Sequence, residues 1–82
     1  MALLYQGVLR VVFTDDSGQQ RSAEFASVLQ EDMPGLYSLG LPPHLPQALG
    51  AQRVCITLPD GRTFAGPISY LAAQVLTFEV PA

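Results

Sequence analysis

The strongest constraint on the fold is one stretch near the end of the chain, VCITLPDGRTFAGPISYLAAQVLTFEV, which covers residues 54–80. Apolar and polar residues alternate on both sides of Asp60-Gly61, and such a pair between alternating runs is typical of a β-hairpin. Glycine fits this turn because it tolerates the positive φ that tight hairpins require. The pattern predicts two antiparallel strands, with Val54, Ile56 and Leu58 facing inward on the first.

The same stretch predicts a third strand in the run QVLTFEV. On the strand before it, we expect Phe64, Ile68 and Tyr70 to share the inner face. Pro67 lies within that strand and has no amide hydrogen to donate to a central ladder. We therefore expect an edge or a bulge at Pro67.

Three further strands are predicted earlier in the chain. The runs GVLRVVFTDD and RSAEFASVLQ alternate around the turn residues of DDSGQQ, and LYSLGL follows the break at MPG. The next stretch, PPHLPQALG, holds too many prolines for a long helix. Pro46 is suited to start one short helical turn, and Gly50 to end it.

Six short strands with tight turns predict an all-β chain that forms a small antiparallel six-stranded barrel, with at most one short helical turn. A compact sandwich is the alternative, but closure into a barrel also removes exposed sheet edges. We expect residues 1–82 to form a single domain, and we find no repeat or linker in the sequence.

Composition predicts a surface that contacts other proteins. Of the 82 residues, 49% are hydrophobic and 13% are charged, whereas globular chains carry about 25% charged residues. A domain this small buries a limited share of its surface, and large exposed apolar patches usually mark a partner. The plain alternative is that small barrels are simply rich in apolar residues.

We expect this surface to bind a protein partner or a second copy of the chain, with a dimer as the expected oligomer. Leu3, Leu4 and Tyr5 precede the first clear strand, and Val75 lies on the outer face of the last one. These four residues are the candidate interaction surface.

Charge and residue types argue against several other functions. The net charge is −3, and four arginines without any lysine do not form the basic stripe of a nucleic-acid binder. The only cysteine, Cys55, and the only histidine, His44, are too few for a metal site in one chain. Nothing places His44 beside Cys55 to activate a thiol.

The paired carboxylates do not indicate catalysis either. Asp15-Asp16 and Glu31-Asp32 both fall in predicted turns, where such residues commonly serve solvation and local hydrogen bonding. A catalytic site needs its groups held together in one cleft. We therefore expect no enzyme activity, no cofactor, no catalytic residue and no metal ligand.

The sequence gives a default location. The first ten residues, MALLYQGVLR, lack the basic start and long apolar core of a signal peptide, and no run approaches the length of a membrane-spanning helix. A single cysteine fits a reducing compartment. We expect a cytoplasmic protein that does not insert into a membrane.

The segment LGAQRVCITLPDGRTFAGPISY, followed by VLTFEV, resembles the PilZ domain, a bacterial six-stranded barrel. PilZ domains often have a glycine before a strand, then an "lpdG" hairpin and a strand that runs out through a glycine. The preceding VVFTDDSGQQRSAEFASVLQEDMPGLYSL fits the first hairpin and the return strand of such a domain. The likeness spans nearly the whole chain.

The motifs by which PilZ domains bind cyclic dimeric GMP are missing. The family uses Arg-x-x-x-Arg before the first strand, whereas this chain has Arg10 alone. It also uses Asp/Asn-x-Ser-x-x-Gly after the second strand, where EDMPGLY carries Pro34 in place of the serine and Tyr37 in place of the last glycine.

The resemblance thus implies a degenerate PilZ-like domain, a non-catalytic protein-interaction module or small regulatory subunit. Degenerate members look like modules of pilus, motility or exopolysaccharide systems. A cyclic dimeric GMP sensing domain is the alternative.

Overall fold

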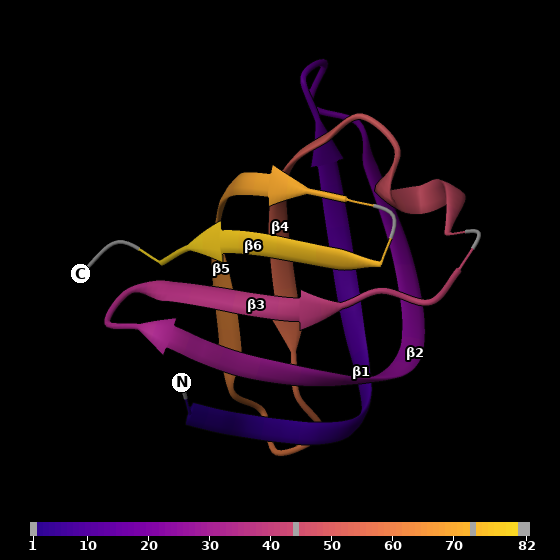
Figure 1. Ribbon diagram of the computed structural model, residues 1–82. Coiled ribbons are helices and arrows are strands. Elements are labelled where there is room, and N and C mark those ends of the chain that lie inside the picture. Colours follow the sequence, from indigo (N-terminus) through magenta and orange to yellow (C-terminus); the bar gives the residue numbers. More distant parts are fainter. Residues whose placement is uncertain (1, 44, 73, 81–82) are drawn as a thin grey trace.

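The computed structural model describes residues 2–43, 45–72 and 74–80, and it confirms an all-β chain (Figure 1). The one helical element among these residues is a 3-10 turn that begins at Pro46, and Gly50 follows it with φ +73°. The elements are β1 (Ala2–Asp15), β2 (Gln20–Met33), β3 (Leu36–Gly40), η1 (Pro46–Ala48), β4 (Ala51–Thr57), β5 (Thr63–Leu71) and β6 (Val75–Glu79).

Strand pairing closes the sheet into the predicted barrel. The order is β1-β2-β3-β6-β5-β4, with β4 pairing back onto β1, and every pair is antiparallel. β1 and β2 are the longest strands, and Figure 1 shows both of them bending as they pass from one side of the barrel to the other. No helix among the described residues is long and apolar enough to cross a membrane.

Two of the hairpin turns are built alike. In the β1–β2 turn, the Asp15 N–H donates to Gln19 O and the Gly18 N–H donates to Asp15 O. In the β4–β5 turn, the Leu58 N–H donates to Arg62 O in the same way, and the Gly61 N–H donates to Leu58 O. Each turn is three residues long and ends at a glycine with positive φ, +87° at Gly18 and +95° at Gly61.

The core fills the inside of the barrel, with buried side chains from β1, β2, β3, β4 and β6 and half-buried Phe64 and Ile68 from β5. The inner faces of β1, β4 and β6 match the period-two prediction, because alternate residues along each strand are buried. The buried hydrophobic residues are Leu9, Val11, Phe13, Leu29, Leu39, Leu41, Ala48, Val54, Ile56, Leu58, Leu76 and Phe78.

The structure corrects three predictions about the strands. β1 begins at Ala2, so Leu3, Leu4 and Tyr5 lie within the first strand rather than before it. Tyr70 is exposed instead of inward, because β5 has an irregularity between Ile68 and Tyr70 that shifts its register against β6.

The third prediction, an edge or a bulge at Pro67, is corrected in part: β5 is not an edge strand of the closed barrel, but a register shift follows this proline between Ile68 and Tyr70. The closed barrel gives β5 a neighbour on each side, but β5 changes partner at this proline. Pro67 is the last residue paired with β4, and the next residue, Ile68, is the first paired with β6. The proline, which has no amide hydrogen, therefore lies where β5 changes its partner strand from β4 to β6, and not on an edge strand of the sheet.

The barrel has an internal repeat that the sequence did not reveal. β1-β2-β3 and β4-β5-β6 each form a meander, and β1 pairs with β4 while β3 pairs with β6. The two like-built turns align Asp15 with Leu58, and therefore Val11 with Val54 and Phe13 with Ile56. An approximate two-fold axis then exchanges the pairs Val11↔Ile56 and Phe13↔Val54. Each β4–β5 pair has its counterpart in the β1–β2 ladder.

Candidate functional site

An apolar groove lies at one end of the barrel. It has a volume of about 570 Å³ and lies between the β3–β4 connection and the end of β5. In Figure 1 this connection and the β5–β6 turn lie at the same end of β3 and β6. Seven residues line it: Leu41, Leu45, Pro46, Ala48, Leu49, Leu71 and Ala72.

Backbone contacts hold the connection that forms one wall of the groove. The Leu41 N–H donates to Gln74 O at 2.9 Å, which ties the start of the connection to the β5–β6 turn. Near its other end, Arg21 Nη1 donates to Leu49 O at 3.1 Å from β2. Between these two points the turn η1 buries Ala48 against the core.

The lining gives the groove a simple chemistry. All seven residues are apolar, so no charged side chain lines the groove. At its rim, Leu49 is 70% exposed and Leu71 is 36% exposed. Burying a leucine side chain contributes roughly 1.5–3 kcal/mol, so an apolar ligand that covers these two residues gains free energy from the contact.

The four residues of the predicted interaction surface do not form one patch. Leu3 is 60% exposed on β1 and Val75 is 36% exposed on β6, but Leu4 and Tyr5 are half-buried and pack against the core. Strand pairing places Leu3 opposite Gln30, Gln30 opposite Ser38, and Ser38 opposite Thr77 on β6. β1 and β6 are thus separated by three strand spacings here, roughly 14 Å.

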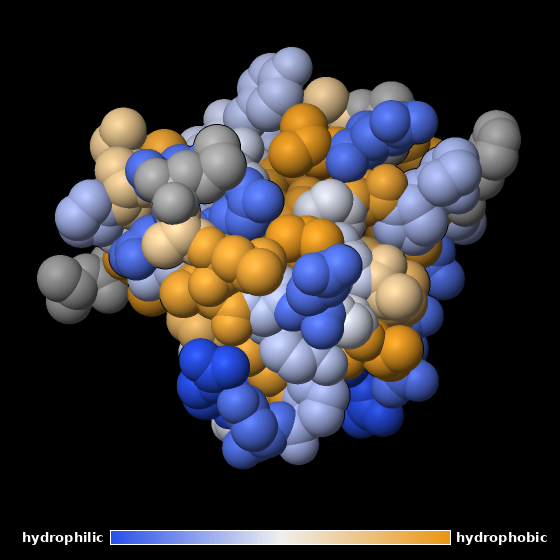
Figure 2. Space-filling view, turned by 60° about the horizontal axis from the view of Figure 1, so that its bottom comes forward, coloured by the Kyte–Doolittle hydropathy of each residue, from blue (hydrophilic) through white to orange (hydrophobic). Residues whose placement is uncertain are grey.

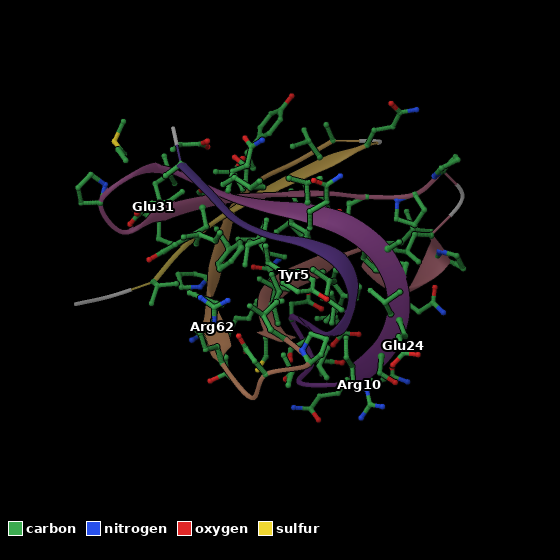
Figure 3. The ribbon with its side chains drawn as sticks, turned by 90° about the horizontal axis from the view of Figure 1, so that it is seen from below. Tyr5, Arg10, Glu24, Glu31 and Arg62 are labelled. Carbon is green, nitrogen blue, oxygen red and sulfur yellow. The ribbon has the colours of Figure 1, made fainter. Side chains whose placement is uncertain are left out.

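Tyr5 closes the lower end of the barrel. Its ring lies so close to Gly7 that a Cβ added there would come within 2.9 Å of the tyrosine Oη. Its hydroxyl donates to Val8 O at 2.8 Å, and Figure 3 shows Tyr5 inside the curve of β1 and β2. Tyr5 therefore covers the end of the core and satisfies a backbone carbonyl.

Val75 adjoins the groove. Its carbonyl accepts a hydrogen bond from the Ala72 N–H at 2.9 Å, and Ala72 lines the groove. Sequence reasoning noted Val75 but missed the groove itself. The available signal was the connection LPPHLPQALG, where leucines stand among prolines without a charged residue.

The arginines do not converge on a phosphate site. Three of them pair with separate carboxylates: Arg10 with Glu24 at 3.6 Å, Arg21 with Asp15 at 3.3 Å, and Arg62 with Asp60 at 2.8 Å. Figure 3 shows Arg10 and Glu24 together, with Arg62 apart from them.

The cysteine, the histidine and the carboxylates are the remaining candidate groups. Cys55 is half-buried on β4, and His44 lies outside the described residues. Across residues 2–43, 45–72 and 74–80, no three His, Cys, Asp or Glu side chains come together in a way that would hold a metal ion.

Glu31 and Asp32 lie within β2 rather than in the predicted turn, and Asp32 accepts a hydrogen bond from the Ser38 hydroxyl. Burial and the nearby charge of Glu31 raise the pKa of Tyr37, which stacks against Phe78.

Comparison with known proteins does not place the chain in a family: no family, curated protein or solved structure matches it significantly. The resemblance to PilZ domains stays a prediction that rests on the sequence pattern alone.

Proposed function

We propose that the chain is a non-catalytic binding module, with a regulatory or scaffolding role, that holds an apolar segment of a partner protein in the end groove. The observation that carries this proposal is the groove of about 570 Å³ with an entirely apolar lining and two exposed leucines at its rim. The composition supports the wider argument, and Figure 2 shows hydrophobic patches that lie between hydrophilic residues on one face of the molecule.

A polypeptide fits this lining better than a small metabolite or a nucleotide does. Small-molecule sites combine apolar walls with a few polar groups that fix the orientation of the ligand, and phosphates are usually bound by arginines or lysines. No side chain in the lining offers a hydrogen-bonding group. Apolar side chains of a partner need no such group, and their burial supplies the free energy of binding.

The test is selection of a displayed random-peptide library on the immobilised protein. We expect apolar peptides to be enriched, and we expect Leu49→Ser to weaken their binding about tenfold, because it removes one leucine contact. Leu3→Ser is the matched control, since Leu3 is also well exposed but lies outside the groove. Circular dichroism checks that both variants keep the strand spectrum.

Two results contradict the proposal. One is a selection that enriches charged peptides or none. The other is a loss of binding in Leu3→Ser as large as that in Leu49→Ser, which would place the binding surface elsewhere.

A further inference from the structure

The two halves of the barrel are equivalent up to one point and then differ. In the first half, the β1–β2 ladder runs through Arg10↔Glu24 and continues to Ala2↔Glu31. In the second half, the counterpart of Arg10↔Glu24 is Arg53↔Pro67, and the β4–β5 ladder ends there. The second half therefore lacks a strand segment that the first half has.

The missing segment leaves one side of β5 open. Ile68, Tyr70 and Leu71 of β5 pair with β6, and no strand in the described part of the chain pairs with the other side of residues 68–71. The chain that precedes β4 turns away at Gly50, where φ is +73°, and forms η1 instead of continuing the ladder. In the first half, the corresponding side of β2 is covered.

The pairing of β2 with β3 and of β5 with β6 identifies the segment that covers β2. Across the β2–β3 turn Met33 pairs with Leu36, and across the β5–β6 turn the Ala72 N–H donates to Val75 O. Counted back from these two turns, Ile68 corresponds to Leu29, and β5 lacks counterparts of residues 25–28 of β2. Leu29 also pairs with Tyr5 on β1, and the ladder continues to Ala2. The covering segment is thus Ala2-Leu3-Leu4-Tyr5, which is extended and uncharged.

The apolar groove lies along this open side of β5. Leu71 and Ala72 line one wall, and residues 45–49 of the connection line the other. The Ala72 N–H donates to Val75 O and so faces β6. Because peptide groups along a strand alternate in direction, those of Leu71 face away from β6, toward the groove.

We propose that the groove binds an extended, uncharged apolar segment of a partner protein, which adds to β5 as an extra strand. This inference rests on the proposed function and specifies the shape and chemistry of the partner. The open peptide groups of Leu71 select an extended backbone, as in other cases of strand addition. The uncharged lining disfavours a charged segment, because burying an unpaired charge is costly.

The irregularity in β5 limits the length of the added strand but does not prevent it. Bulges commonly protect open edges against long strands. However, the covering segment in the first half also has a register shift, between Leu3 and Tyr5, and still pairs with β2. The added segment is therefore short, comparable to Ala2–Tyr5.

The probe that tests this proposal is a capped peptide of sequence Ala-Leu-Leu-Tyr-Gln-Gly with two C-terminal lysines for solubility. Two further peptides carry N-methyl groups on the backbone: one at the first, third and fifth residues, and the other at the second, fourth and sixth. An added strand bonds to β5 through one set only, so we expect one version to lose at least about tenfold in affinity and the other to bind like the parent peptide. Hydrogen exchange should show new protection of the Leu71 amide.

Each other outcome overturns the proposal. Equal binding by the two methylated versions excludes strand addition, but it leaves the proposed function in place if Leu49→Ser still weakens the parent peptide. Absence of binding at millimolar peptide excludes this kind of occupant, while the library selection separately decides whether the groove binds any apolar peptide. Protection of the Leu71 amide that rises with protein concentration alone would identify a second copy of the chain as the occupant.

Discussion

At the scale of single residues, two carboxylates, those of Asp15 and Asp60, stabilise turns. Asp15 Oδ1 accepts hydrogen bonds from the Ser17 hydroxyl at 2.6 Å and from the Ser17 and Gln19 N–H groups at 3.0 Å. The Ser17 hydroxyl is the largest cause that lowers the pKa of Asp15 below its ordinary value of 3.8, although burial opposes it. Asp60 has a lowered pKa mainly because it accepts from the Arg62 N–H.

The lowered pKa of Asp15 predicts a pH dependence of stability. A carboxyl whose pKa is lower in the folded than in the unfolded state stabilises the fold above the unfolded pKa and loses this contribution as the pH falls through the folded one. We therefore expect the Tm to fall between pH 5 and pH 2, and to fall less in Asp15→Asn. Thermal unfolding followed by circular dichroism measures both.

The matched control is Asp16→Asn, at the neighbouring exposed turn residue. It should keep the full decrease in Tm, because no side-chain hydrogen bond links Asp16 to the rest of the described chain. An equal effect of the two substitutions would show that net charge, rather than the hydrogen bonds of Asp15, causes the pH dependence.

At the scale of strands and turns, close packing of backbones depends on Gly66. This residue is buried in β5, and a Cβ added to it would lie 1.7 Å from Glu79 O at the end of β6. The absence of a side chain lets β6 cross close over β5, as glycines do at the corners of barrels.

We expect Gly66→Ala to destabilise the fold by about 3 kcal/mol or more, because the backbone of β6 must shift to admit the methyl group. The free energy of unfolding in urea measures this loss. Gly40→Ala is the matched control in β3, where the added Cβ would meet only the Ser27 hydroxyl at 3.1 Å. A smaller loss in Gly66→Ala than in Gly40→Ala would contradict the close crossing of β5 and β6.

The sequence predicted the features of the fold that depend on neighbouring residues. The turn at Asp60-Gly61 and the inward side of β4 follow from local backbone preference and alternation. It could not predict the outward position of Tyr70, because the register shift before this residue depends on β6. The groove was also beyond local reasoning, since it forms where the chain at Gly50 departs from β5.

At the scale of the whole molecule, two regions of exposed apolar surface are candidates for contact with other proteins. One is the groove, where Leu49 and Leu71 are exposed. The other is the outer face of the first half of β1, where Leu3 is 60% and Val8 is 51% exposed and no residue from Ala2 to Leu9 is charged. A chain with few charges leaves both uncovered, so each requires its own test.

We assign the predicted dimer to the second region, because this region contains Leu3 of the candidate interaction surface. We expect sedimentation equilibrium at micromolar concentration to show a dimer, because two copies related by a two-fold axis bury the same uncharged strip of β1 twice. Leu3→Ser, with an unchanged strand spectrum, should shift the equilibrium to monomer, whereas Leu49→Ser should leave the dimer intact. A monomer mass for the unmodified chain would contradict the dimer and leave the groove as the surface by which this protein contacts others. Dissociation by Leu49→Ser alone would instead assign self-association to the groove, in conflict with the partner segment proposed for it.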